Sequence, residues 1–587
     1  YSIVLNLIII SENVALIDGL LGISVLIGVY FGCFGKKQDN TTEYLLGGKT
    51  MSCFPVSMSL IASHVSAVSL LAVPVEVYQY GTQYAACIFT SFISCALISL
   101  IYLPVFYQLQ LTSTFEYLEM RFTRPVRTFA SFLYTLSLII YIPLIIYVPA
   151  LAFSQATSIN LHLITPIICT VCIFYTTIGG LKAVVWADTI QMTVTLGSLF
   201  AVFILGTTAV GGVFETWRIS EEGSRIEFWK YDRLSNFYYY YYYYYYLVSN
   251  QVSIQRFLAV PNIKEAAIAF MGLCMVAIKW VSVFTGLIMY TRYHKCDPIS
   301  THVISRSDQL LPYYVLDVAA NIPGLPGLFL AGLVSAGLST MSANLNTVAG
   351  TIYEDFIDPC LPDSGNKEER AAKIMKVYGK VLPLFVFFDK NRLGDIFRVS
   401  LSLHGITSGA MLGIFTLGML VPWATSKGAI AGGLLSMLSM IWIIVGAQVN
   451  MIQKRLIYPP LPTSTEDCLN GEFAPNQTTT STNDVLPSAD EKPFILFTIS
   501  FMYYTLIGFL ISMVVGTIVS FLFGVNDLRE VDRNHFPPIV QRYGNILVLI
   551  SMKNGRTIDR HGRVVSDFCH RKNTPRFQCV RYQTRWW

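Results

Sequence analysis

Apolar runs of about 20 residues recur from one end of this chain to the other, and they constrain its fold more than any other feature. An α-helix rises 1.5 Å per residue, so about 20 apolar residues cross the ~30 Å hydrocarbon core of a bilayer. Charged residues make up only 13% of the chain, about half the share found in soluble domains. The runs are continuous and do not alternate with period two, which excludes a β-barrel. The sequence therefore predicts an all-α, polytopic membrane protein.

Thirteen runs are expected to span the membrane, which places the two termini on opposite sides. These spans cover residues 13–33, 53–75, 83–107, 128–154, 160–179, 183–213, 237–252, 265–290, 325–350, 374–388, 398–424, 428–449 and 494–524. Cytoplasmic loops carry an excess of lysine and arginine. The loops that contain Lys36, Arg124 and Lys367 alternate onto the same side as the basic C-terminal tail. We therefore expect a plasma-membrane protein with an extracellular N-terminus and a cytoplasmic C-terminus.

The same topology predicts which loops meet the extracellular solution. The loop 450–493 falls outside and contains a sequon at Asn476, so we expect Asn476 to be glycosylated. A second sequon, at Asn40, falls inside and is expected to stay unmodified. Cys296 and Cys468 also lie in outer loops, where the environment allows a disulfide bond between them.

Two stretches interrupt the regular pattern. Tyr238 to Tyr246 are nine consecutive tyrosines, which a span tolerates only if their hydroxyls find partners. The segment 374–388 has too few residues to cross cleanly before Asp389. Both stretches are more typical of an error in the gene sequence than of a designed span. Residues 526–587 hold twelve Lys/Arg and five Asp/Glu without clear periodicity, and we expect a disordered or spurious tail there.

Polar residues inside spans are costly, so they mark candidate functional sites. The second span contains Pro74, expected to break that helix, and four serines: Ser59, Ser63, Ser66 and Ser69. The ninth span contains Ser339 and Thr340 among small residues, and a third cluster is formed by Asn250 and Gln251. For any single serine, close packing between helices is the simpler interpretation.

The packing interpretation is weaker for the adjacent pair Ser339 and Thr340. Neighbouring side chains point about 100° apart on a helix, so both hydroxyls cannot serve one packing seam. Hydroxyl oxygens combined with carbonyls freed at a helix break form the hard-oxygen site that suits an alkali cation. The sequence therefore predicts a cation site between the second and ninth spans.

Nine strings of residues occur here in the order in which one family has them. They are TSTFEYLEMRF from Thr112, GGLKAVVWADTIQ from Gly179, NQVSIQR from Asn250, CDP from Cys296, DQLLPYYV from Asp308, PGLPGLFLAG from Pro323, LST from Leu338, EDF from Glu354 and PWATSKGAIAG from Pro422. With these strings the chain resembles the sodium/solute symporter family, in its branch of multivitamin, monocarboxylate and iodide symporters. The resemblance covers about residues 15–525.

The resemblance implies a LeuT-like core of two inverted five-helix repeats within about thirteen transmembrane helices. It also implies a sodium site between the first and eighth core helices. The residues that match its side-chain ligands are Ser339 and Thr340, and those that match its carbonyl ligands are Ala62, Val65 and Ala336.

Asp188 matches an acidic position that the family links to sodium coupling. The simpler interpretation of Asp188 is a salt bridge to Lys182 or to another base of the inner loops. The resemblance also divides the chain into four parts: 1–52 with the extracellular N-terminus, first helix and inner loop; 53–449 with the transport core; 450–525 with the glycosylated outer loop and last helix; and the tail 526–587.

The function implied is sodium-coupled import of a small organic anion, a monocarboxylate or a vitamin such as biotin or pantothenate, by alternating access. The solute is expected beside the sodium, near Ser66, Ser69, Asn250 and Gln251. The sugar branch of the family has a histidine where this chain has Ser69, which argues against a sugar. The sequence contains no P-loop, metal-ligand motif or nucleophile–base pair, so no enzyme activity, cofactor or nucleic-acid partner is expected. Two alternatives remain, a non-transporting sensor of the same fold and an inactive family member.

Overall fold

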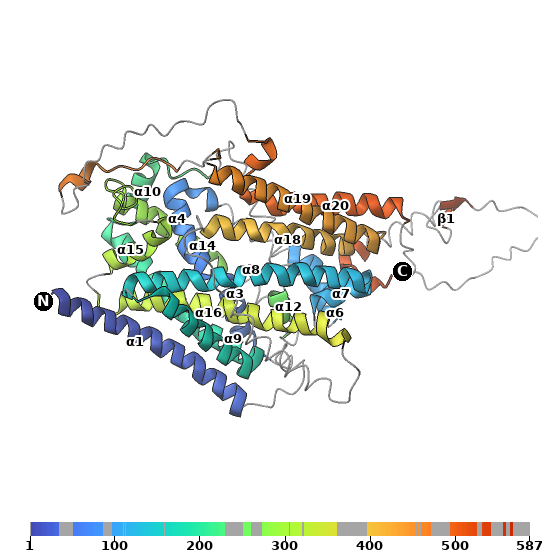
Figure 1. Cartoon of the computed structure of the whole chain (residues 1–587), viewed down its shortest axis with the longest axis horizontal. Coiled ribbons are helices and arrows are strands. Elements are labelled where there is room, and N and C mark those ends of the chain that lie inside the picture. Colours follow the sequence, from blue (N-terminus) through green and yellow to red (C-terminus); the bar gives the residue numbers. More distant parts are fainter. Residues whose placement is uncertain are drawn as a thin grey trace, which may run out of the picture.

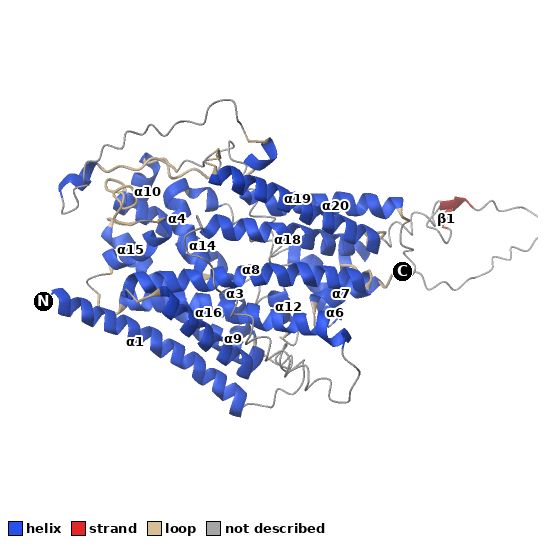
Figure 2. Cartoon of the chain, viewed as in Figure 1, coloured by secondary structure: helices blue, strands red, loops and turns tan. Residues whose placement is uncertain are grey.

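Long helices form nearly all of the regular structure in the computed structural model (Figure 1, Figure 2). The structure describes residues 2–34, 51–85, 88, 97–109, 111, 113–157, 159–228, 251–259, 273–304, 306–319, 322–360, 396–453, 455–456, 460–470, 493–524, 531–541, 556–558 and 564–566. The tyrosine run, the segment 374–388 and the predicted sites Asn40, Asn250 and Asn476 lie outside the described residues.

The α-helices have the following bounds: α1 Ser2–Val29, α3 Cys53–His64, α4 Ala67–Tyr80, α6 Leu103–Leu109, α7 Thr114–Arg121, α8 Arg124–Thr157, α9 Leu161–Ala209, α10 Val213–Glu222, α12 Gln251–Leu258, α14 Leu273–Tyr293, α15 Leu310–Val318, α16 Leu325–Ile352, α18 Ile396–Leu420, α19 Ser426–Ile452 and α20 Tyr504–Leu522. Three π-helical turns, Tyr30–Phe34, Ile98–Tyr102 and Tyr353–Ile357, adjoin α1, α6 and α16. Short 3-10 turns are Thr82–Ala85, Ser307–Gln309, Asp358–Cys360, Glu466–Asn470, Ile495–Thr498, Phe501–Tyr503 and Arg533–His535. Strands β1 (Arg556–Ile558) and β2 (Val564–Ser566) pair antiparallel, with Thr557 opposite Val565.

The long helix α9 contains two of the predicted spans. Its 49 residues would extend about 74 Å as one straight helix, more than twice the ~30 Å core of a bilayer. Gly180 breaks it with a φ of 55°, a backbone conformation that glycine adopts without a Cβ clash. The break separates the predicted spans 160–179 and 183–213.

Six described helices are long and apolar enough to cross a membrane, or seven if the bent pair α3 and α4 counts as one span. Most predicted spans coincide with a described helix or part of one. The predicted last span, 494–524, differs, because α20 begins only at Tyr504 after two short 3-10 turns. The total of thirteen spans stays a prediction.

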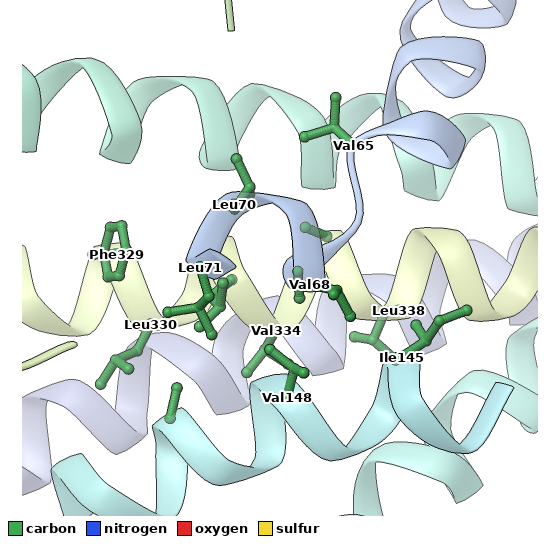
Figure 3. Packing of buried hydrophobic residues seen from close by; sticks show 14 of the residues in the cluster. Val65, Val68, Leu70, Leu71, Ile145, Val148, Phe329, Leu330, Val334 and Leu338 are labelled. Atoms are coloured by element: carbon green, nitrogen blue, oxygen red, sulfur yellow. The ribbon is translucent and has the colours of Figure 1, made fainter. Parts of the chain in front are cut away.

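The helix α16 lies at the centre of the molecule. It packs most extensively against α9, and then against α8 and α1, and all but two of its 28 residues are buried. Small residues allow this close approach: a Cβ added at Gly337 would lie 2.7 Å from Cγ of Pro149 in α8. Figure 3 shows Leu338 and Val334 of α16 against Ile145 and Val148 of α8, beside the start of α4.

Segments that the sequence assigns to the outer face meet one another in the structure. Cys296 and Cys468 form a disulfide bond across 172 residues, as the sequence allowed. Next to it, the Tyr78 hydroxyl at the end of α4 donates to Asp297 Oδ1 at 2.7 Å. The buried guanidinium of Arg225 donates to Tyr78 O at 2.8 Å and to Pro462 O at 2.9 Å. One face of the bundle is therefore closed by three loops that are remote in sequence.

Segments assigned to the inner face also meet. Residues 531–541 of the basic tail pack against α6 and α7, although this region shows no periodicity in the sequence. In Figure 1, α6 and α7 lie at the end of the bundle opposite α10 and α15.

Candidate functional site

A break between α3 and α4 forms the centre of the candidate site. The two helices are bent by 55°, and the residues between them, Val65 and Ser66, have non-helical backbone angles. The Ser66 side chain caps α4 by accepting a hydrogen bond from the Ser69 amide at 3.3 Å. Serine is a preferred N-cap because its oxygen satisfies an unpaired amide of the first turn. Figure 3 shows Val65 on the extended segment of this break.

The break does not lie at Pro74, where the sequence was expected to place it. Pro74 is inside α4. A proline within a helix removes one backbone hydrogen bond but does not by itself supply a cap. Ser66 supplies a cap, so the helix restarts there, eight residues earlier.

Two hydroxyls of α16 converge on this break. Ser339 Oγ lies 3.2 Å from Ala62 O, the carbonyl of the last turn of α3, and 3.1 Å from Ala336 O. Thr340 Oγ1 lies 3.5 Å from Ala62 O and 2.9 Å from Ala336 O. Both side chains are 1% exposed. Four oxygens from two helices therefore meet at one buried point.

This arrangement corrects one part of the sequence argument and leaves the hypothesis intact. The two hydroxyls were expected to diverge by about 100°, yet both reach the same pair of carbonyls, because each also bonds back to Ala336 on its own helix. Of the five predicted sodium ligands, the structure brings four together. Val65 lies at the break, where its described hydrogen bond joins its amide to Ile61 O.

Asp188 of α9 lies in a fully buried ionic cluster toward the inner end of α3. Its Oδ2 accepts hydrogen bonds from Ser59 Oγ at 2.6 Å and from Arg256 Nη2 at 3.1 Å. Arg256 Nε donates to the same Ser59 Oγ at 2.8 Å, and Ser342 of α16 lies near the carboxylate. The ion pair is thus with Arg256 and not with Lys182, the partner named from the sequence.

The cluster joins α3, α9 and α12 around one charge pair. The side chains of Asp188 and Arg256 are 0% and 1% exposed. A buried pair of this kind is strongly destabilised when one partner is removed, because the other charge is left uncompensated. Sequence analysis missed Arg256 as a functional residue, although it ends the string NQVSIQR that carries the family resemblance.

The predicted solute residues surround the start of α4. Ser66 is 5% exposed, and the hydroxyl of Tyr141 in α8 hydrogen-bonds with its side chain. The Tyr141 ring contacts His404 of α18 edge to face, with 4.7 Å between centroids. Gln251 begins α12, and its side chain is outside the described part of the structure. Sequence analysis did not place Tyr141 or His404 at this site, because their helices meet α4 only in the folded molecule.

A further contact reaches the helix of the hydroxyl pair. The hydroxyl of Tyr175 in α9, which is fully buried, donates to Leu338 O at 3.3 Å, and Cys172 Sγ lies 3.7 Å from the same carbonyl. Leu338 directly precedes Ser339. This contact fixes α16 against α9 beside the oxygen cluster. Within the described residues, no group of three or more His, Cys, Asp or Glu side chains could hold a metal ion.

Comparisons with known proteins agree with this geometry. The profile of the Sodium:solute symporter family matches residues 44–436. The "Sodium-coupled monocarboxylate transporter 2" of Mus musculus is 35% identical over 559 residues, which cover 91% of this chain and 87% of that protein. The "Sodium-coupled monocarboxylate transporter 1" of Homo sapiens is 33% identical over 533 residues, covering 86% and 85%.

A solved structure shows the fold. A Na+-coupled sialic acid symporter, in its substrate-bound outward-open state, superposes with a TM-score of 0.70 at 23% identity. The superposition covers 88% of this chain and 99% of that one. The helical architecture is therefore the LeuT-like one that the sequence predicted.

Proposed function

The chain belongs to the sodium:solute symporter family, and from that premise we propose that it imports a small organic anion together with sodium. The anion is a monocarboxylate or a vitamin carboxylate such as biotin or pantothenate. Sodium-coupled solute transport is a property of the family and needs neither catalysis nor a cofactor. The finer statement, that the solute is an anion, is supported by the relatives named as monocarboxylate transporters and by the surroundings of Ser66.

The observation that carries the proposal is the convergence of the Ser339 and Thr340 hydroxyls on Ala62 O at the break. Hydroxyl and carbonyl oxygens are the ligands that transporters offer to sodium at broken helices. In the proposed site, sodium displaces the hydroxyl hydrogens from these carbonyls and is bound by Ser339, Thr340, Ala62 and Ala336, with Val65 O as a fifth ligand.

The proposed solute position lies beside the sodium, where α4 begins. A helix N-terminus carries a partial positive charge and unpaired amides, both of which stabilise a carboxylate. The Ser66 and Tyr141 hydroxyls and His404 add polar groups next to this helix end. Asn250 and Gln251 stay part of the proposal from the sequence.

Coupling follows if each ligand raises the affinity for the other, which is necessarily reciprocal. Sodium in the oxygen cluster holds α3 against α16 and so completes the cavity at the start of α4. In the proposed cycle the core then opens inward and both ligands leave. At −90 mV, one sodium charge that crosses the membrane contributes about 2 kcal/mol. Asp188, paired with Arg256 at the inner end of α3, is the proposed coupling residue.

The proposed orientation places the N-terminus outside and the C-terminus in the cytoplasm of a cell whose plasma membrane holds the protein. The disulfide between Cys296 and Cys468 supports it, because such bonds persist in the oxidising extracellular environment and are rare in the cytosol.

Uptake measurements test the proposal. Cells that express the chain are given labelled butyrate, nicotinate or biotin in sodium medium and in choline medium, with glucose and myo-inositol as competitors. We expect sodium-dependent uptake that unlabelled carboxylates inhibit and the polyols do not. Inhibition by the polyols alone would contradict an anionic solute, and equal uptake in choline would contradict sodium coupling.

A further inference from the structure

Residues 531–541 form a small folded unit after α20, which we call the inner strap. Asp532 caps its 3-10 turn by accepting from the Asn534 amide at 3.1 Å. The Gln541 side chain closes the unit by donating to Arg533 O at 2.8 Å and to Phe536 O at 2.7 Å. The inner strap therefore has its own hydrogen bonds and binds its neighbours as one piece.

One side of the inner strap is buried against α7. Phe536 is 1% exposed and His535 is 6% exposed. The Tyr117 hydroxyl donates to His535 O at 3.1 Å, and the Arg121 guanidinium lies over the Phe536 ring, 5.1 Å from its centroid. The ring thus covers a buried cation with its negative face, a favourable contact in a place that water does not reach.

Arg121 also joins α7 to the inner end of α18. Its Nε donates to Gly418 O at 2.9 Å, and its Nη2 donates to Val421 O at 3.0 Å and to Pro422 O at 2.8 Å. These bonds cap carbonyls that the helix end leaves unpaired. The contact between the inner strap and α7 is therefore built on a fixed platform of α7 and α18.

The other side of the inner strap contacts α6 much more weakly. The described hydrogen bond there joins Gln108 Nε2 to Asn534 Oδ1 at 2.8 Å, and it is exposed to solvent. Water can replace a bond between two neutral amides at low cost. If the inner strap detaches from one neighbour, it detaches from α6 first.

The two neighbours of the inner strap belong to different halves of the proposed sodium site. α6 contacts α12, and α12 contacts α3, which bears Ala62. α7 packs on α8, and α8 packs on α16, which bears Ser339 and Thr340. Release of sodium toward the cytoplasm requires the inner parts of these two groups to separate. The inner strap bridges them on the side where the separation occurs.

We propose that the inner strap is a latch that holds the inner side closed while it bridges α6 and α7, and that it leaves α6 in each transport cycle. This inference rests on the proposed alternating-access function. The buried contact with α7 persists through the cycle, whereas the bond between Gln108 and Asn534 breaks when the inner pathway opens.

Cross-linking of the weak contact tests the latch. Gln108→Cys and Asn534→Cys are combined, and the pair is bridged with a short, membrane-permeant bifunctional methanethiosulfonate. Sodium favours the outward-open form, so we expect it to accelerate bridging at least threefold over choline. We also expect bridged chains to lose at least four fifths of their uptake and to recover it when a reductant removes the bridge.

Two controls separate the latch from other causes. Each single cysteine variant should keep its uptake under the same reagents, which accounts for the other cysteines and for the outer disulfide. The pair Arg533→Cys and Gln541→Cys lies wholly within the inner strap, so bridging it should depend on neither sodium nor conformation and should leave uptake unchanged.

The outcomes also distinguish the latch from the proposed solute. A bridging rate that does not depend on sodium, or bridged chains that transport at the wild-type rate, would overturn the latch. If wild-type chains transport none of the tested anions, the proposed solute is wrong, while the effect of sodium on bridging still decides the latch. Adding Thr340→Val to the cysteine pair should abolish that effect if sodium acts through the proposed cluster.

Discussion

At the scale of residues, the oxygen cluster distinguishes a sodium site from a packing seam through Thr340. Its Oγ1 lies 2.9 Å from Ala336 O and 3.5 Å from Ala62 O. Loss of this oxygen should cost about 1.5–3 kcal/mol, as for a hydrogen bond to a charged group. At about 1.4 kcal/mol per decade, Thr340→Val should lower apparent sodium affinity about ten- to hundredfold, whereas Thr340→Ser should have a mild effect.

Sodium activation curves of uptake, corrected for surface expression, measure this difference. At saturating sodium, solute affinity should recover in Thr340→Val. Packing alone predicts the reverse order, because valine fills the space of threonine and serine leaves a methyl-sized void. A valine variant that behaves like the wild type would therefore exclude Thr340 as a ligand.

The ion pair of Asp188 and Arg256 gives a second prediction. Arg256→Gln leaves the buried carboxylate without its counter-charge, and breaking such pairs typically costs about 3–5 kcal/mol. We expect little mature protein at the cell surface. Adding Asp188→Asn removes the second charge and should restore surface expression, with sodium-dependent uptake still impaired.

Surface biotinylation and uptake of the two single variants and the double variant measure these effects. The exposed pair of Arg218 and Glu222 in α10, at 2.7 Å, provides the control, because exposed pairs contribute little to stability. A double variant with full sodium-coupled uptake would show that the cluster only supports the fold.

At the scale of elements, the break between α3 and α4 is the feature on which both proposed ligand positions depend. The structure assigns the break to the cap at Ser66 and leaves Pro74 within α4. We therefore expect Pro74→Ala to retain most of its uptake, because the helix on both sides of Pro74 is already continuous.

Ser66→Ala is the counterpart of that variant. Loss of a serine cap typically costs about 1 kcal/mol, and it should weaken both sodium and solute affinity, while Ser66→Thr keeps an oxygen and should behave better. Affinities from uptake curves test the comparison. A severe defect in Pro74→Ala with a normal Ser66→Ala would return the break to Pro74.

At the scale of the whole molecule, the two faces of the bundle have different chemistry. One face holds the disulfide between Cys296 and Cys468, and the other holds the inner strap. The predicted topology places the first face outside the cell. Asn476 should then be glycosylated and Asn40 should not. Endoglycosidase should shift the wild-type band and leave Asn476→Gln unshifted, whereas a shift that depends on Asn40 would reverse the orientation.

Much of the fold was accessible from the sequence, because a bilayer leaves a chain few choices. Apolar runs must form helices that satisfy their own backbone, so the predicted spans coincide with α8, α16 and α19. The hydroxyl pair of α16 was also identified from the sequence, since polar residues inside a span have few other reasons to occur. The first residue of α20 and the position of the helix break were wrong, because both depend on local caps and turns rather than on hydropathy.

The sequence by itself determined the membrane class, the helical spans and the polar positions within them, because these follow from local hydropathy and from the length needed to cross a bilayer. Only the tertiary structure decided which remote groups meet. Asp188 pairs with Arg256, 68 residues away, and the inner strap binds α7, which lies more than 400 residues earlier. Such pairings are chosen by the packing of whole helices, which fixes distances of a few ångströms that no local pattern in the chain records.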